Sequence, residues 1–143
     1  MLAEYAQLRA YIQHYAPPGK RIEIVAGEWG YHSDETPNGL TFEKQAQYAA
    51  RVFLLNLSAG MAFNIWFTWK DGTWSLKGVN NFGLLRFNGT ELKPSYRALK
   101  TLASVLAGYT FQKRVALGDP AVYAFQFAKA GGQPAYALWT TGA

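Results

Sequence analysis

The hydrophobic and polar residues of this chain follow two different patterns. Up to about residue 108, helical spacings of apolar residues alternate with short continuous apolar runs. Beyond that point, apolar and polar residues alternate with a period of two, which is typical of half-buried strands. The change of period predicts an α/β segment over residues 1–108 and a small antiparallel β unit over residues 109–143.

The first segment predicts the order helix, strand, helix, strand. A helix is expected over residues 2–15, ended by Pro17-Pro18-Gly19, and a buried strand over 22–27. A second helix, capped by Thr41, is expected to reach about Ser58, and a strand over 62–68 follows. Longer loops leave these strands than enter them, as in parallel β/α units, whose ligand sites lie beyond the carboxyl ends of the strands. The residues expected to be buried are Ile22, Ile24 and Val25 in the first strand, and Ala46, Ala49, Ala50, Phe53, Leu54 and Leu57 in the second helix.

The remainder of the chain predicts a long loop, a helix and a hairpin. Residues 70–93 form a long aromatic loop of the kind that usually carries function or minor structure of its own. Pro94 suits the first turn of a helix that ends near Gly108. Two period-two segments then meet at Gly131-Gly132-Gln133-Pro134, which predicts a hairpin.

Candidate chemistry lies where the first strand ends. Glu28 follows the β-branched run directly and is flanked by Trp29 and Tyr31. Aromatic neighbours lower the local dielectric and can hold a flat apolar face of a substrate. The chain also contains five Trp, nine Tyr and nine Phe, an excess that favours a partner bound by stacking. The competing interpretation is an ordinary solvated loop carboxylate at Glu28.

Composition narrows the classes of partner. The net charge is +5, but the basic residues are scattered, with Lys20-Arg21 and Lys113-Arg114 as the only adjacent pairs, so nucleic acid is not expected. The absence of cysteine excludes disulfides, thiolate metal sites and a Cys nucleophile, and the two histidines show no metal-ligand spacing. No metal and no cofactor are expected. Polar residues interrupt the apolar stretch 52–69, so no membrane span is expected, and no cleavable signal is visible at the start.

Five short motifs in a fixed order carry a resemblance to a known family. They are Glu28-Trp29-Gly30-Tyr31, the segment 45–51, the segment 66–71, Asn81-Phe82-Gly83-Leu84-Leu85 and the segment 93–99. In this order, over residues 1–107, they resemble the C-terminal part of a retaining glycoside hydrolase of the (β/α)8-barrel clan, similar to families 5 and 39. Residues 109–140 resemble the β-sandwich that such enzymes often carry.

The resemblance implies a partial (β/α)8 (TIM) barrel. Residues 1–15 match the sixth barrel helix, 22–27 the seventh strand, 62–68 the eighth strand and 94–107 the final helix. Carbohydrate is the substrate that the resemblance implies. It also points to a secreted or periplasmic protein, although the sequence leaves a cytoplasmic location open.

The resemblance also implies roles for individual residues. Glu28 matches the nucleophile, and Trp66 or Trp69 matches the aromatic residue that stacks on the sugar. Tyr31 matches the tyrosine near the nucleophile only loosely. Trp29 and Trp74 are further candidates for a stacking surface.

One part of the family pattern is missing. The acid/base glutamate belongs to the fourth strand, and nothing here corresponds to strands one to six. Retaining hydrolysis needs two carboxyl groups about 5 Å apart. Glu23 is expected to face the wrong way and to lie too deep. Asp34, Glu35 and Asp71 are conceivable substitutes, each more simply explained as a solvated loop charge.

The missing strands also leave two open sheet edges and uncovered apolar faces. The chain is therefore expected to associate, either with its own copies or with a missing N-terminal part of the barrel.

Three functional hypotheses follow. The first is a glycosidase or a fragment of one, with Glu28 as nucleophile. The second is a catalytically silent carbohydrate-binding or structural remnant. The third is an esterase-type hydrolase, which is disfavoured because the chain has neither a Gly-x-Ser-x-Gly elbow nor a Ser-x-x-Lys motif.

Overall fold

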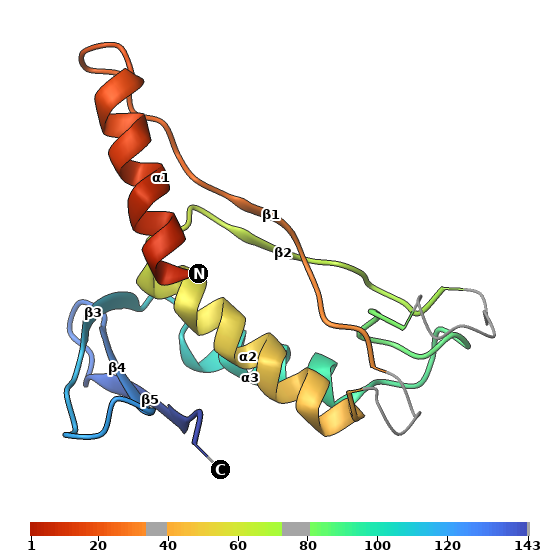
Figure 1. Ribbon diagram of the computed structural model, residues 1–143. Coiled ribbons are helices and arrows are strands. Elements are labelled where there is room, and N and C mark those ends of the chain that lie inside the picture. The colour runs from red at the N-terminus through yellow and green to blue at the C-terminus, as the bar shows by residue number, and fades with distance from the viewer. Residues whose placement is uncertain (34–39, 73–80, 143) are drawn as a thin grey trace.

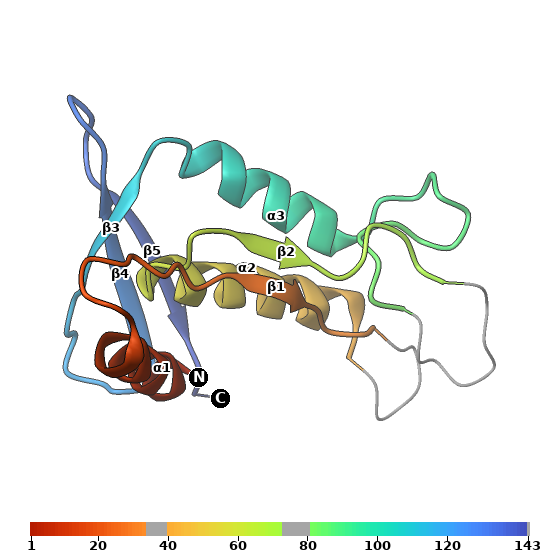
Figure 2. The same cartoon turned by 90° about the horizontal axis from the view of Figure 1, so that it is seen from above.

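A parallel two-stranded sheet and an antiparallel three-stranded sheet share one pair of packed helices (Figure 1). The computed structural model describes residues 1–33, 40–72 and 81–142. Helices α2 (Phe42–Ser58) and α3 (Pro94–Val105) lie side by side on one face of the sheet formed by β1 (Ala26–Trp29) and β2 (Asn64–Trp66) (Figure 2). The elements are α1 (Leu2–Tyr15), β1 (Ala26–Trp29), α2 (Phe42–Ser58), β2 (Asn64–Trp66), α3 (Pro94–Val105), β3 (Thr110–Arg114), β4 (Val122–Ala128) and β5 (Ala135–Thr140).

The helix boundaries follow local signals and confirm the predicted helices. The Thr41 side chain accepts a hydrogen bond from the backbone N–H of Lys44 at 3.2 Å, which caps α2. Gly60, just beyond α2, has a φ of +66°, a conformation that glycine adopts without strain. Pro94 occupies the first turn of α3.

The parallel strands are shorter than predicted and shifted along the chain. The first is Ala26–Trp29 instead of 22–27, and the second covers only Asn64–Trp66. Ile24 is buried, but Ile22 and Val25 are 41% and 44% exposed, so the prediction of three buried residues is wrong for two of them. The reason is physical: within the described residues β1 pairs with β2 alone, and a parallel strand is buried on both faces only where further strands and helices cover it.

The buried face of α2 also differs from the predicted apolar one. Ala49 and Leu54 are buried as expected, whereas Leu57 is exposed. The buried positions include two amides, Gln45 and Asn56. Both bond to segments distant in sequence, so a pattern based on apolar residues could not place them.

The C-terminal sheet packs against the second halves of α2 and α3. Strands β4 and β5 are antiparallel, which confirms the predicted hairpin, and β3 adds a strand on the other side of β4. Phe125 and Phe127 form its buried core with Leu54 of α2. Tyr123 and Trp139 stack on this face, with centroids 4.9 Å apart and rings inclined by 12°. The boundary near residue 108 remains a prediction.

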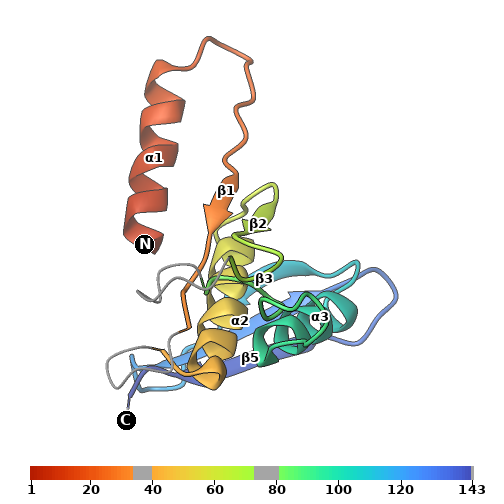
Figure 3. The ribbon, with the colours of Figure 1, turned by 90° about the vertical axis from the view of Figure 1, so that its right-hand side faces the viewer.

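Side chains in the first two-thirds of helix α1 bond to the end of α2 and the turn after it. The Tyr5 hydroxyl donates to Asn56 Oδ1 at 2.8 Å, and the Arg9 guanidinium donates to the carbonyl oxygens of Ala59 and Gly60. Its fourteen residues include no buried one, and the helix stands apart from β1, joined to it by a turn at its far end (Figure 3). Among the described helices, none combines the length and apolarity needed to cross a membrane.

Candidate active site

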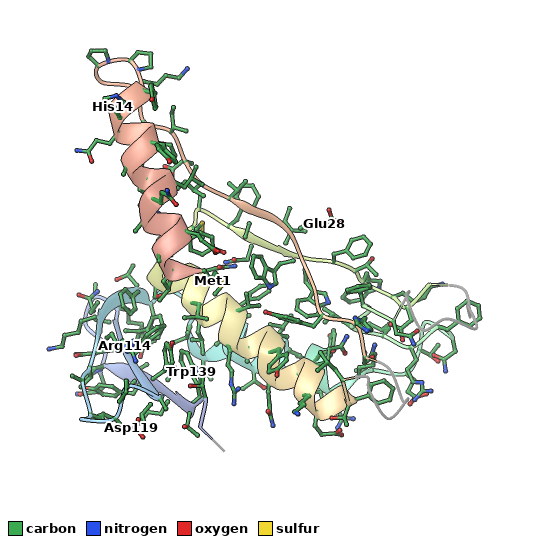
Figure 4. All side chains as sticks on the ribbon, viewed as in Figure 1. Met1, His14, Glu28, Arg114, Asp119 and Trp139 are labelled. Carbon is green, nitrogen blue, oxygen red and sulfur yellow. The ribbon has the colours of Figure 1, made fainter. Side chains whose placement is uncertain are left out.

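Glu28 occupies the end of β1, one residue before the strand finishes. Its side chain projects from the strand on the side away from α2 (Figure 4). It is exposed and lines a hollow of about 230 Å³ whose other wall includes Tyr5 and Leu8 of α1. The half-buried Trp29 lines the same hollow. The structure thus places Glu28 at the carboxyl end of a parallel strand, with access to a ligand.

Tyr31 and Trp66 pack on the other side of the β1–β2 sheet, against α2. The ring of Tyr31 lies 5.2 Å from that of Tyr48, and the ring of Trp66 lies 6.4 Å from that of Phe53. The indole N–H of Trp66 donates to the carbonyl oxygen of Phe82 at 2.9 Å. These contacts make both residues part of the packing beneath the sheet and separate them from the side on which Glu28 projects.

Trp69 lies beyond the end of β2 and is 61% exposed. One edge of its indole meets the ring of Tyr96 from α3 at 5.9 Å, with the planes inclined by 74°. Of the two tryptophans proposed for sugar stacking, Trp69 is therefore the more exposed. Trp74 lies outside the described residues.

Asp71 is a buried structural carboxylate, and the expectation of a solvated loop charge is wrong. It is 5% exposed, and its oxygens lie 2.9 and 3.2 Å from Lys93 Nζ. The backbone N–H of Gly83 donates to Asp71 Oδ1 at 2.8 Å. Lys93 is 1% exposed; burial lowers the pKa of its ammonium below 10.5, and the bond to Asp71 opposes that shift. An acid engaged in this way is unsuited to replace the missing proton donor.

Within the described residues, none of the other candidates supplies an unpaired carboxylate that could serve as the proton donor. The expectation that Glu23 lies deep is wrong, because its side chain is half-exposed and pairs with the guanidinium of Arg21. Residues 20–23 are exposed and precede the first backbone hydrogen bond of this segment to the β2 side, which Ile24 accepts from Ala62 N. Asp34 and Glu35 lie outside the described residues.

A polar network that sequence reasoning missed ties together the segments that follow β1 and β2. The carbonyl oxygen of Asn81 accepts four hydrogen bonds: from Ser33 N at 2.9 Å, Ser33 Oγ at 3.1 Å, Gln45 Nε2 at 3.2 Å and Lys93 Nζ at 3.1 Å. Gln45 also donates to the carbonyl of Tyr31 at 2.7 Å. These partners are 12 to 48 residues apart in the sequence, so local patterns could not predict the network. The one local indication of it was Gln45, a polar residue on the buried face of α2.

Two glycines allow the close approach that this network requires. A Cβ at Gly83 would lie 2.1 Å from the backbone nitrogen of Asp71, and a Cβ at Gly30 would lie 2.2 Å from the carbonyl oxygen of Phe67. Real Cβ atoms do not approach backbone atoms this closely. Both positions therefore need glycine, and both lie within motifs on which the family resemblance depends.

Comparison with solved structures identifies a similar protein. A family 39 glycoside hydrolase from the gut symbiont Bacteroides cellulosilyticus WH2 superposes with a TM-score of 0.81 and 28% sequence identity. The chain resembles part of a glycosidase. The match covers 97% of this chain and 28% of the hydrolase, so the chain spans little more than a quarter of the length of the protein it resembles. A scan of protein families and a search of curated proteins find no match.

Proposed function

We propose that this chain forms the C-terminal part of a retaining glycoside hydrolase barrel and that Glu28 is its nucleophile. The observation that supports this most directly is the place of Glu28, exposed at the end of a parallel strand on the side away from α2, in a fold similar to a family 39 hydrolase. In β/α barrels the helices cover the outside and the active site lies at the carboxyl ends of the strands. The side that Glu28 occupies would then face the barrel interior.

In the proposed reaction the Glu28 carboxylate attacks the anomeric carbon of the bound sugar. The bond to the leaving oxygen breaks as an acid group protonates that oxygen, and a covalent glycosyl ester forms on Glu28. The same group then takes a proton from water, which attacks the anomeric carbon and releases Glu28. Because Glu23 and Asp71 are engaged in ion pairs, we assign the acid to the part of the barrel beyond this chain.

Substrate contact is proposed for the aromatic residues near the strand ends. Trp69 offers an exposed indole on which an apolar sugar face can stack, and Trp29 borders the same hollow as Glu28. Trp74 is a further candidate. Tyr31 and Trp66 would contribute indirectly, because their contacts on the α2 side of the sheet support the strand ends.

A silent carbohydrate-binding or structural role is the alternative, and the engaged state of Glu23 and Asp71 favours it for the chain by itself. A chimera distinguishes the two. This chain would replace the matched region of the Bacteroides hydrolase, and a panel of aryl glycosides would be tested for hydrolysis. If the chimera is active, and if Glu28→Gln in the chimera abolishes hydrolysis while Glu23→Gln does not, the proposal is supported. Sugar binding without hydrolysis favours the silent role, and hydrolysis that survives Glu28→Gln excludes Glu28 as nucleophile.

A further inference from the structure

A second pocket lies between helix α2 and the β4–β5 hairpin. We call it the α2–hairpin pocket. Figure 4 shows Trp139, which lines it, and Glu28 on opposite sides of α2. Its volume is about 190 Å³, several times the ~30 Å³ that one water molecule occupies in the liquid. Among the described residues, none lines both this pocket and the hollow beside Glu28. The residues that line the α2–hairpin pocket are Tyr31, Tyr48, Arg51, Val52, Leu55, Tyr123, Trp139 and Thr141.

Four aromatic residues of this pocket form two pairs. The rings of Tyr31 and Tyr48 meet edge to face with centroids 5.2 Å apart, and those of Tyr123 and Trp139 stack at 4.9 Å. All four residues are partly exposed. Within the described residues, the hydroxyl groups of the three tyrosines take part in no hydrogen bond. The pocket therefore offers aromatic surface together with polar groups that are free to bond a ligand.

Arg51 gives the pocket its charge. It is the one charged residue among the described residues that line the pocket, and its side chain is half-buried. In the part of the chain that the structure describes, its guanidinium has neither a hydrogen-bond nor an ion-pair partner. A guanidinium presents a planar fork of N–H groups that matches the two oxygens of a carboxylate. The pocket is thus complementary in charge to an anionic ligand, and in geometry to a carboxylate.

We propose that the α2–hairpin pocket binds one sugar ring that carries a carboxylate, which is a uronic acid residue. The carboxylate bonds to Arg51, the ring hydroxyls bond to the tyrosine hydroxyls, and the apolar face of the sugar lies on the indole of Trp139. An aromatic carboxylate would also suit Arg51 and the rings, but it would leave the tyrosine hydroxyls without partners. This binding site is additional to the proposed catalytic site and does not depend on it.

The test is calorimetric titration of the chain with methyl β-D-glucuronide and with its neutral counterpart, methyl β-D-glucoside. We expect the glucuronide to bind at least about tenfold more tightly, because only its carboxylate can form charge-assisted bonds to Arg51. Arg51→Met should weaken glucuronide binding by at least about tenfold for the same reason. Arg97→Met is the matched control, since it removes the same charge from an exposed position on α3, and it should bind as the wild type does.

Two further measurements do not depend on the arginine variants. Tyr48→Phe removes only a hydroxyl without a described partner, so the fold should be kept, and glucuronide binding should weaken about three- to tenfold. In nuclear magnetic resonance spectra, the indole N–H signal of Trp139 should move on addition of the glucuronide. The signal of Trp29, which borders the hollow beside Glu28, should stay in place.

Several results would overturn the proposal. They are no binding of the glucuronide, equally tight binding of the glucoside or of benzoate, and unchanged binding in Arg51→Met or Tyr48→Phe. Movement of the Trp29 signal in place of the Trp139 signal would also overturn it, because the sugar would then bind beside Glu28. None of these measurements involves hydrolysis or the Glu28 side chain, so failure of this proposal and failure of the catalytic one are distinguishable.

Discussion

Replacement of Lys93 by methionine tests the buried network beneath the strand ends. The ammonium lies 2.9 Å from Asp71 Oδ1, and the two side chains are 1% and 7% exposed. Lys93→Met keeps most of the aliphatic volume but leaves the Asp71 carboxylate buried, with the N–H of Gly83 at 2.8 Å as a remaining partner. Breaking a buried ion pair on one side typically costs about 3–5 kcal/mol. That is a large part of the roughly 5–15 kcal/mol by which native domains are stable.

The assay is urea unfolding followed by tryptophan fluorescence, with thermal unfolding beside it. At about 3 °C per kcal/mol for a chain of this size, Lys93→Met should lower Tm by about 9–15 °C. The double variant Lys93→Met with Asp71→Asn should lose less than the sum of the two single variants, because no unpaired charge remains buried. A loss below about 1 kcal/mol for Lys93→Met, or additive losses in the double variant, would refute the assigned role of the pair.

The same pair predicts a dependence on pH. Burial lowers the folded-state pKa of Lys93 below its ordinary value of 10.5, against the opposing effect of Asp71. Between the lowered pKa and 10.5 the unfolded chain binds more protons at this residue than the folded chain, so its contribution to stability rises with pH in that window. The difference in unfolding free energy between wild type and Lys93→Met should therefore increase as pH approaches 10.5. A difference that shrinks over this range would contradict the assignment.

The remaining predictions concern packing and one tyrosine. Gly83→Ala should cost more than about 3 kcal/mol, because its Cβ would meet backbone at 2.1 Å, while Gly27→Ala, with open space at the Cβ, should change stability by less than about 1 kcal/mol in urea unfolding. Tyr5→Phe should cost about 1–2 kcal/mol, because the hydroxyl bonds Asn56 Oδ1 at 2.8 Å. Burial raises the pKa of Tyr5 above 10.0, so wild type should lose this contribution as pH rises through and beyond 10 and the variant should not; equal pH profiles would contradict this. Phe125→Ala should cost about 3–5 kcal/mol, and a loss below about 1 kcal/mol would show that the C-terminal sheet lacks the core described.

Local signals predicted the helices and the hairpin because the physics of these elements is local. The Thr41 cap, Pro94 in a first turn and glycine after α2 each act within a few residues. Gly131 adopts a φ of +67° in the predicted hairpin. The strand 22–27 was placed less well, because burial of a parallel strand depends on neighbours that its own sequence does not contain.

In the candidate site too, the features set by neighbouring residues could be predicted and those set by distant residues could not. The position of Glu28 at a strand end follows from a hydrophobic run and the glycines beside it, which are local features. The role of Asp71 does not, because its partner Lys93 lies 22 residues further along the chain. The side on which Trp66 packs was also beyond the sequence, since the register of β1 and β2 shifts between Ala26 and Trp29.

Covalent labelling of Glu28 is the sharpest test of its role as the nucleophile. The chimera with the Bacteroides hydrolase would be treated with an activated 2-fluoro glycosyl fluoride, chosen from the glycosides that it binds, and fragmentation of the labelled peptide would locate the adduct. We predict one glycosyl adduct per chain, on Glu28, and none in the Glu28→Gln variant. An adduct on another carboxylate, or no adduct despite demonstrated binding, would contradict this role.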